Sequence, residues 1–346
     1  MKFNVSETII KKGSLSCEPM IERAPSGELV CLCQFDGPME PHPENRVYVF
    51  HSKDNGKTWD DGVSIYEDGN AVYCTELAVN DGVLTTFITI HSGRFLDWKC
   101  WVFESRDNGY TWEKIAPAPC VPDYTFVRLQ VKLANGDIVY SYQHYEITPE
   151  MEQAIKDNPD IPETDKFCWK ARKPVMENGV ENVEVGLIIS HDGGKTWEKS
   201  VAAQIPMNLA WTWAEPHVVE FEPGHLVMLI RPATGTTMFV SKCESFDSGK
   251  TWSKVEYTDI PNPSNKPFFM KLANGEAVLI HTPSENNKRT PCEIWFTNDG
   301  AKSWYRKEIL STDGRCDYAD AFEEDGHLYI VQEHFRTTLH FYDVEF

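Results

Sequence analysis

Acidic side chains stand next to proline or tyrosine at three distant points of the chain. Glu18 and Glu215 each precede a proline, and Asp317 precedes Tyr318. Hydrolysis of a glycosidic bond uses one carboxylic acid to protonate the leaving oxygen and a second carboxylate as base or nucleophile. Glu18 and Glu215 are therefore candidates for such a pair, and Asp317 with Tyr318 is a competing constellation.

Basic, imidazole and aromatic side chains could bind a sugar beside these acids. The substrate-binding candidates are His42, Arg94, Asp97, Arg128, His144, Trp213, Arg231, Lys266 and Glu333. Each has a structural alternative. A buried acid at a strand entrance can bond backbone amides, Arg128 and Lys266 can be ion-pair partners of Glu215 or Asp317, and an aromatic ring can serve ordinary packing.

An eight-residue pattern, Ser/Thr-x-Asp-x-Gly-x-Thr-Trp or a close variant, occurs five times. The segments are 52–59, 105–112, 190–197, 245–252 and 297–304, and the last has Ala301 after Asp299-Gly300 and Ser303 in place of threonine. Their aspartates stand at 54, 107, 192, 247 and 299, so the intervals are 53, 85, 55 and 52 residues. A repeat with this period is typical of propellers and other arrays.

The chemistry of the repeated box favours a structural role. Its aspartate can accept backbone N–H bonds across a tight turn, its glycine can adopt a positive φ, and its tryptophan can pack between sheets. Each box should therefore cap a β-hairpin. The box lacks the ligand spacing of a calcium loop and the upstream glycine of a phosphate loop. We expect no cofactor, and no ligand spacing requires a metal, although a calcium or sodium ion deep in the fold stays open.

A second repeat, a glycine turn between two apolar alternating runs, occurs six times. The turns end at Gly27, Gly82, Gly136, Gly224, Gly275 and Gly326. The sixth unit ends after three expected strands, while residues 2–10 supply one that is unassigned. Pairing this N-terminal strand with the last unit closes a ring and removes a free sheet edge. We therefore predict a single all-β domain over residues 1–346, a six-bladed β-propeller closed by its N-terminal strand.

With five boxes over essentially its whole length, the chain resembles the Asp-box (BNR-repeat) proteins of the sialidase superfamily. The resemblance implies that each box joins the third and fourth strands of a blade, on the face away from the active site. True sialidases begin an arginine triad with Arg-Ile-Pro where this chain reads Cys17-Glu18-Pro19. A glutamate there would repel the carboxylate of sialic acid. Tyr318 matches the family's nucleophilic tyrosine, whose nucleophilicity Asp317 would raise, and Glu333 resembles the glutamate on the next strand.

Aligning the six units on their turns places several polar groups near the starts of the innermost strands. These are Glu18-Pro19, Val127-Arg128, Glu215-Pro216, Lys266-Pro267 and Asp317-Tyr318, with Tyr73 and Glu76 nearby in the second unit. Innermost strands face the axis, so the groups should converge at the mouth of the channel. Glu18 and Glu215, in opposite blades, could leave the roughly 6.5–9.5 Å of an inverting pair, which is the arrangement that we favour.

The longest interval between boxes predicts an insertion at about residues 144–184, in the third blade. Thr148-Pro149-Glu150 offers an N-cap, a proline in the first turn and an acid beside it, so we expect a short helix there. The insertion could form a lid over the mouth or a contact in an oligomer.

Composition narrows the function further. The net charge of -20 argues against nucleic-acid binding, and no apolar run is long enough to cross a bilayer. Residues 1–17 lack the apolar core of a signal peptide, so we expect a cytoplasmic protein. The ten cysteines include no C-x-x-C pair and should be buried free thiols.

Three functions are consistent with these residues. The first, which we favour, is an exo-glycosidase that removes a terminal neutral or uronic sugar from an oligosaccharide or glycoconjugate. The second is a uronate-specific oligosaccharide lyase with a tyrosine or histidine base, and Arg94, Arg128 and Lys266 would neutralise the uronate. The third is a non-catalytic carbohydrate-binding propeller.

Overall fold

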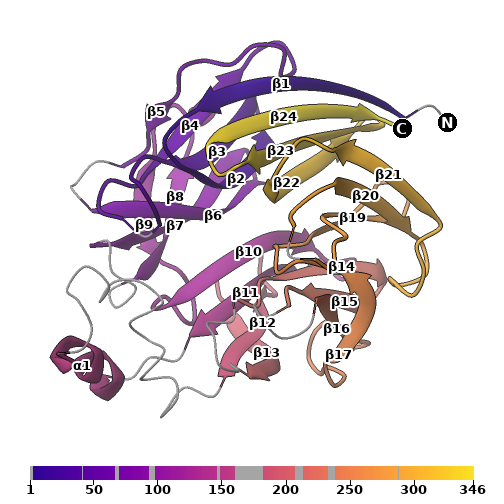
Figure 1. Cartoon of the computed structure of the whole chain (residues 1–346). Helices are drawn as coiled ribbons and strands as arrows, with labels where there is room; N and C mark the ends of the chain where they lie inside the picture. The colour runs from indigo at the N-terminus through magenta and orange to yellow at the C-terminus, as the bar shows by residue number, and fades with distance from the viewer. Residues whose placement is uncertain are drawn as a thin grey trace.

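The computed structural model describes residues 3–40, 42–66, 70–92, 98–145, 149–159, 182–206, 213–232, 238–286 and 288–346. Within these residues the strands form six antiparallel sheets of four strands each. The sheets are arranged as blades around a central axis (Figure 1). The predicted six-bladed β-propeller is therefore confirmed.

The strands follow one another through the blades in chain order. Blade 1 holds β2 (Ser16–Arg23), β3 (Leu29–Phe35), β4 (Arg46–Ser52) and β5 (Val63–Ser64). Blade 2 holds β6 (Ala71–Asn80), β7 (Val83–His91), β8 (Lys99–Ser105) and β9 (Glu113–Pro117). Blade 3 holds β10 (Thr125–Lys132), β11 (Ile138–Tyr145), β12 (Asn182–Ser190) and β13 (Glu198–Pro206).

The remaining blades repeat the same plan. Blade 4 holds β14 (Pro216–Glu222), β15 (His225–Ile230), β16 (Phe239–Ser245) and β17 (Glu256–Pro261). Blade 5 holds β18 (Phe268–Lys271), β19 (Ala277–His281), β20 (Cys292–Thr297) and β21 (Arg306–Ser311). Blade 6 holds β22 (Cys316–Glu324), β23 (His327–His334), β24 (Thr338–Glu345) and, as its fourth strand, β1 (Asn4–Lys12).

The N-terminal strand closes the ring. β1 pairs antiparallel with β24, from Asn4 opposite Glu345 to Lys12 opposite Thr338. The first and last strands lie side by side at one edge of the molecule (Figure 1). The predicted closure is confirmed, and it explains why the sixth unit needs no box: its fourth strand comes from the other end of the chain.

Each Asp box forms the hairpin between the third and fourth strands of blades 1 to 5. In the first box, Asp54 Oδ1 accepts a hydrogen bond from the Thr58 backbone N–H at 2.8 Å, and Asp54 Oδ2 accepts one from Thr58 Oγ1 at 2.6 Å. Trp59 Nε1 donates to the Gly56 carbonyl at 3.2 Å. The predicted structural role of the box is therefore confirmed.

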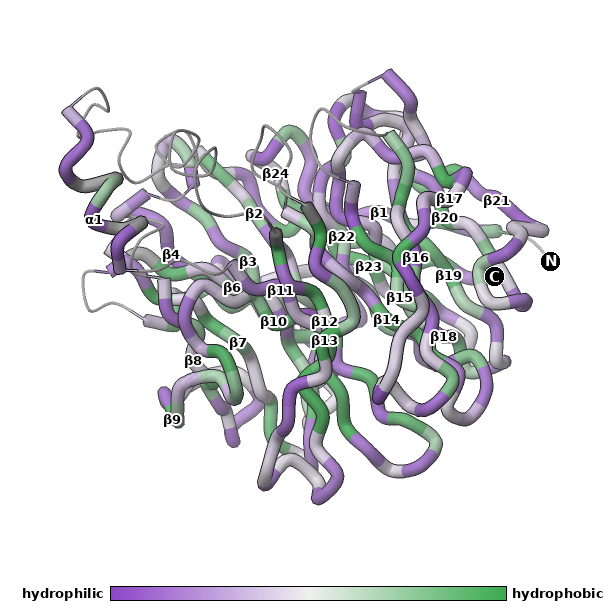
Figure 2. The backbone as a smooth tube through the Cα atoms, turned by 90° about the horizontal axis from the view of Figure 1, so that it is seen from below, coloured by the Kyte–Doolittle hydropathy of each residue, from purple (hydrophilic) through white to green (hydrophobic). Residues whose placement is uncertain are grey.

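Apolar side chains from facing blades form the core. Every residue of β3 is buried, which fits a strand packed on both faces by neighbouring blades. Of the described cysteines all are free and only Cys120 is exposed, as expected for buried thiols. Hydrophobic stretches run along the strands, while the turns between them are largely hydrophilic (Figure 2).

The insertion in blade 3 contains the predicted helix, α1 (Pro149–Asp157), which lies at the periphery of the molecule (Figure 1). Its expected N-cap, Thr148, lies outside the described residues. Whether the insertion is a lid or an oligomer contact stays a prediction. No helix in the described ranges is long and apolar enough to span a membrane.

Candidate active site

Irregularities in the innermost strands aim polar side chains at the axis. The pairing register shifts between Cys17 and Met20 in β2, and between Cys316 and Ala319 in β22. Similar shifts interrupt β6 and β10. A β-bulge redirects the side chains of the bulged strand, and Glu18 at this point has a left-handed φ of 50°. The alignment of the six units on their glycine turns predicted that these polar groups lie near the axis. The bulges explain how their side chains converge there.

Glu18 is fully buried, and both of its oxygens are occupied. Oε2 accepts hydrogen bonds from Arg128 Nη1 at 2.8 Å and from Lys266 Nζ at 2.6 Å. Oε1 accepts one from Tyr73 Oη at 2.9 Å. Burial opposes the ionisation of Glu18, but the positive charges of Arg128 and Lys266 outweigh the effect of burial and lower the pKa of Glu18 to about 2. Two cations on one carboxylate leave a positive charge, so the repulsion expected from Glu18 alone is offset.

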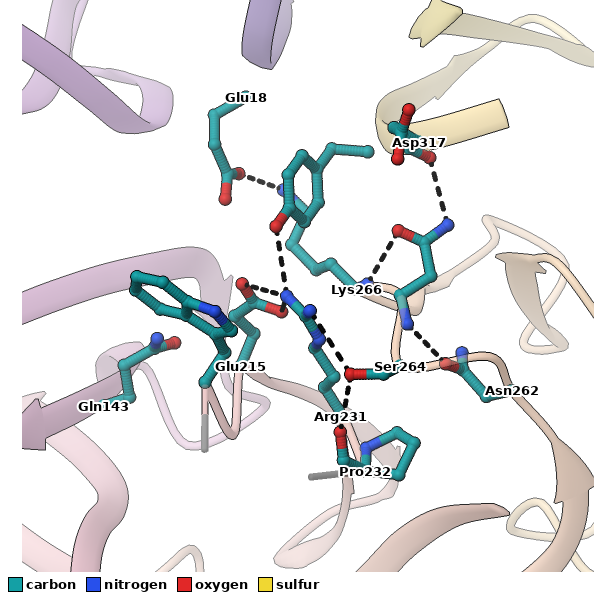
Figure 3. Close-up of polar contacts among 12 residues, drawn as sticks. Glu18, Gln143, Glu215, Arg231, Pro232, Asn262, Ser264, Lys266 and Asp317 are labelled. Atoms are coloured by element: carbon teal, nitrogen blue, oxygen red, sulfur yellow. Dashed lines mark hydrogen bonds and ion pairs between the residues drawn. The ribbon is translucent and has the colours of Figure 1, made fainter. Parts of the chain in front are cut away.

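A second centre joins a carboxylate, a guanidinium and a phenol. Arg231 Nη1 donates to Glu215 Oε1 at 2.9 Å, to Glu215 Oε2 at 2.8 Å and to Tyr318 Oη at 3.0 Å. Arg231 Nη2 donates to Ser264 Oγ at 3.3 Å, which fixes the guanidinium (Figure 3). Burial raises the pKa of Tyr318, while the charge of Arg231 acts to lower it. The phenol is therefore protonated at neutral pH, and it shares Arg231 Nη1 with the Glu215 carboxylate.

Arg128 connects the two centres. Besides its bond to Glu18, its Nη2 lies 3.8 Å from Glu215 Oε1. Its Nε donates to Gln143 Oε1 at 3.4 Å, and Gln143 in turn donates to Tyr145 Oη at 3.0 Å. Arg128 is thus an ion-pair partner of both Glu18 and Glu215. The sequence had left open a structural role for Arg128 as an ion-pair partner of Glu215 or Asp317.

Asp317 faces away from the hydroxyl of its neighbour Tyr318. Its carboxylate pairs with Arg289 Nη1 and with Arg315 Nε, the latter at 2.9 Å from Oδ1 and 2.8 Å from Oδ2. Successive residues of a strand point to opposite sides, so adjacency in sequence does not bring the two side chains together. The carboxylate that shares Arg231 Nη1 with the Tyr318 hydroxyl is that of Glu215, from blade 4.

The site is cationic although the chain carries a net charge of -20. Around Tyr318 and Glu215, four cationic side chains are paired with three carboxylates: Arg128, Arg231, Lys266 and Arg289 with Glu18, Glu215 and Asp317. Lys266 Nζ lies 5.3 Å from the centroid of the Tyr318 ring, and the guanidinium carbons of Arg231 and Arg289 each lie 5.9 Å from it. This arrangement suits an anionic ligand.

Glu333 is buried on β23 at the seam between blades 6 and 1. Neither of its oxygens has a hydrogen-bond partner among the described residues. Burial raises the pKa of Glu333 well above its usual range, which favours its protonated form. The nearby Arg336 pairs with Glu40 and donates to Cys17 Sγ at 3.0 Å.

Among the other predicted site residues, Trp213 continues the chain from Arg128, since its carbonyl accepts a hydrogen bond from Tyr145 Oη at 2.7 Å. His42 belongs to a loop turn, in which its N–H donates to Asn45 Oδ1 at 2.7 Å. His144 Nδ1 lies 2.8 Å from Thr125 Oγ1. Trp213 packs edge-on against Phe126 at a centroid distance of 6.3 Å. Arg94 and Asp97 are not among the described residues.

Sequence reasoning missed several residues of the site. Arg289, Arg315 and Ser264 support Asp317 and Arg231, and Glu40 pairs with Arg336. Arg315 immediately precedes an innermost strand, and that position was the signal that could have identified it. The others lie in loops that have no counterpart in the repeat. Within the described ranges, no group of three His, Cys, Asp or Glu side chains is arranged to hold a metal ion.

Comparisons with known proteins agree with this fold. The Hadza microbial sialidase Hz136 superposes with a TM-score of 0.73 at 16% identity, over 96% of this chain and 66% of that one. The NanB sialidase from Streptococcus pneumoniae superposes with a TM-score of 0.69 at 14% identity, over 97% of this chain and 69% of that one. This chain thus spans about two thirds of the length of these sialidases. A protein of unknown function from Dyadobacter fermentans superposes with a TM-score of 0.71 at 16% identity, over 99% of both chains.

Such low identities show the fold alone, and no curated protein matches the sequence significantly. The model of the BNR repeat-like domain, however, matches residues 65–330, which is most of the chain. The chain therefore belongs to the BNR repeat-like domain family and has the six-bladed Asp-box propeller of the sialidase superfamily.

Proposed function

We propose that this protein is a glycoside hydrolase that removes a terminal acidic sugar from an oligosaccharide or glycoconjugate, with Tyr318 as the nucleophile and Glu215 as its base. One observation carries the proposal: a single nitrogen of Arg231 lies within 3.0 Å of both carboxylate oxygens of Glu215 and of the Tyr318 hydroxyl. A phenol, a proton acceptor and a fixed positive charge are thus held together in one buried place.

The arrangement suits covalent catalysis. As Tyr318 Oη forms a bond to the anomeric carbon, its proton passes to Glu215 and the bond to the aglycone oxygen breaks. A phenol that transfers its proton to a neighbouring carboxylate avoids the cost of a free buried phenolate. Water then attacks the anomeric carbon and loses a proton, which the departed aglycone oxyanion takes up through solvent, while Tyr318 leaves and recovers its own proton from Glu215. The outcome is retention of configuration at the anomeric carbon.

The excess of cations supports an acidic rather than a neutral sugar. A buried excess positive charge is costly unless an anion compensates it. A carboxylate on the terminal sugar would supply that anion, and the planar guanidinium groups of Arg231 and Arg289 match it in shape. The sialidases with the same fold act on a sugar of this kind, as their names state.

Glu18 has a different role in this proposal from that of a general acid. It is ionised, fully buried and bound by three donors, so it has no proton to give to a leaving oxygen. It holds Lys266 in place beside Tyr318 and Arg128 in place beside Glu215. The Tyr318–Glu215 pair therefore replaces the Glu18–Glu215 pair as the preferred catalytic set.

A turnover screen with 4-methylumbelliferyl glycosides tests the proposal, because their leaving group departs without a proton from the enzyme. The panel contains the N-acetylneuraminide, the glucuronide and the neutral galactoside. We expect release from an acidic member, abolished in Tyr318→Phe and Glu215→Gln. Tyr305→Phe is the matched control, since it loses only a bond to Glu276 in an exposed turn.

Other outcomes would redirect the proposal. Release of the neutral sugar alone would contradict the acidic substrate. A product that contains an unsaturated sugar would indicate elimination by a lyase. Saturable binding of an acidic sugar without any turnover would indicate a carbohydrate-binding propeller.

A further inference from the structure

A cavity of about 540 Å³ adjoins the Tyr318 site, between blades 5 and 6. Ser264, Lys288, Arg289, Arg315 and Phe335 are among its lining residues. Arg289 belongs to both places, because its guanidinium lines the cavity and also lies 5.9 Å from the centroid of the Tyr318 ring. A ligand in the cavity would therefore be a direct neighbour of a sugar bound at Tyr318.

The lining of this cavity is cationic. Lys288, Arg289 and Arg315 line it, and none of its lining residues is an acid. The balancing carboxylate, Asp317, is fully buried behind the two arginines and pairs with both. One carboxylate for three cations leaves the cavity positive, and the two guanidinium planes are held in fixed orientations by their bonds to Asp317.

An aromatic ring stands at the rim of the same cavity. Phe335 is 58% exposed, which is unusual for a phenylalanine and unnecessary for the core. Both Phe335 and Arg336 have left-handed backbones, with φ of 54° and 57°, which non-glycine residues adopt at a cost. The ring packs over Gly314, where an added Cβ would lie 1.7 Å from it. The chain therefore uses backbone strain and a glycine to hold an exposed ring beside three cations.

We propose that this cavity is a second sugar subsite, which takes an acidic sugar on the aglycone side of the scissile bond. The sugar ring would stack on Phe335 and its carboxylate would bind Arg315 and Lys288, while Arg289 serves the terminal sugar. The inference rests on the proposed function and extends it. The preferred substrate is then an oligosaccharide in which both the terminal sugar and the next one are acidic.

The test compares two substrates that share the terminal sugar released in the aryl-glycoside screen. For a sialoside these are α2,8-linked disialic acid, with an acidic second sugar, and 3′-sialyllactose, with a neutral one. For a uronide they are a disaccharide of two glucuronic acids and a glucuronide of galactose. The variant is Lys288→Gln with Phe335→Asn. Both side chains are exposed, and asparagine tolerates the left-handed backbone at 335.

We expect the variant to raise KM for the doubly acidic substrate roughly tenfold, with a much smaller change for its neutral counterpart and with kcat retained. The control is Lys250→Gln, because Lys250 is exposed in the Asp-box turn of blade 4. This variant should leave KM unchanged for both substrates. Equal effects on the two substrates, or no effect on either, would overturn the subsite.

Failure of the proposed function is distinguishable from failure of the subsite. If the wild-type protein cleaves no aryl glycoside, calorimetric titrations with disialic acid and trigalacturonic acid test the cavity directly. Binding that the double variant weakens tenfold would support the subsite in a non-hydrolysing protein. Absence of binding by both probes would overturn the subsite as well.

Discussion

The guanidinium of Arg128 lies between two buried carboxylates from opposite blades. Its Nη1 is 2.8 Å from Glu18 Oε2 and its Nη2 is 3.8 Å from Glu215 Oε1. Blades 1, 3 and 4 are thus tied together at the axis by charge rather than by apolar packing. A buried ion network of this kind contributes little when complete but is costly when one member is removed.

Replacing Arg128 by methionine should therefore destabilise the protein by about 3–5 kcal/mol, because Glu18 and Glu215 lose a shared cation in a buried place. Urea unfolding measures this loss. In the double variant Glu18→Gln/Arg128→Met the loss should be smaller than the sum of the single losses, because the glutamine leaves no uncompensated charge at position 18. Strict additivity would contradict the network.

Arg106→Met is the control for this experiment. Arg106 pairs with Glu104 at 2.6 Å, but its side chain is 70% exposed. Exposed pairs of this kind contribute only about 0–1 kcal/mol. A loss as large as that of Arg128→Met would show that the assay does not report on the buried network.

Arg231→Lys should lower kcat on the aryl glycoside by roughly 10²-fold, in the range seen when one donor at a reacting centre is removed. Lysine keeps the charge but cannot hold Glu215, Tyr318 and Ser264 at once in the plane of a guanidinium. Steady-state kinetics separate this effect from KM. Arg306→Lys, on β21 with Glu308 as its partner, is the control. A kcat within twofold of wild type would contradict the role of Arg231.

The repeat predicted the fold and also much of the axial network. Because the units share a register, residues that precede equivalent strands must meet at the axis, however far apart they lie in sequence. Glu18 therefore contacts Arg128, 110 residues away, and Lys266, 248 residues away. Aligning the turns predicts that these side chains converge, but not how they pair: the ion pairs expected for Arg128 and Lys266 were with Glu215 or Asp317, whereas both bind Glu18.

Pairings made by loops could not be predicted in this way. Arg289 and Glu40 lie where the units differ, so no register relates them to Asp317 and Arg336. The bulges were also invisible, since they depend on hydrogen bonding between strands rather than on residue type. For the same reason the sequence paired Asp317 with Tyr318, whereas the structure turns the two side chains apart.

Asp320 gives a prediction on the pH dependence of stability. Its Oδ2 accepts the Ile21 backbone N–H at 2.8 Å, which joins blades 6 and 1. Burial raises its pKa from 3.8 to about 7. A raised pKa in the folded state means that the protonated form stabilises the fold below pH 4, and that this contribution is lost as the pH rises through 7.

Asp320→Asn keeps an acceptor for the Ile21 N–H but cannot ionise. Between pH 5 and pH 8 the wild type should lose on the order of 2 kcal/mol relative to this variant. In a domain of 346 residues that is a relative Tm shift of roughly 3 °C. Thermal unfolding followed at pH 5, 6.5 and 8 measures it. A difference in Tm that is the same at all three pH values would contradict the assignment.

The closure by β1 gives the last prediction. Removal of residues 1–12 leaves β24 as an open edge, because β1 is its outer partner along the whole length from Asn4 to Lys12. An unpaired edge invites pairing with another chain, so the truncated protein should be less stable to urea and should elute as larger species than the full chain. A synthetic peptide of residues 1–12 should reverse both changes. The same peptide with Glu7→Pro and Thr8→Pro should not, because proline cannot donate to the strand ladder. Rescue by both peptides would mean that β1 acts through its side chains rather than through its pairing with β24.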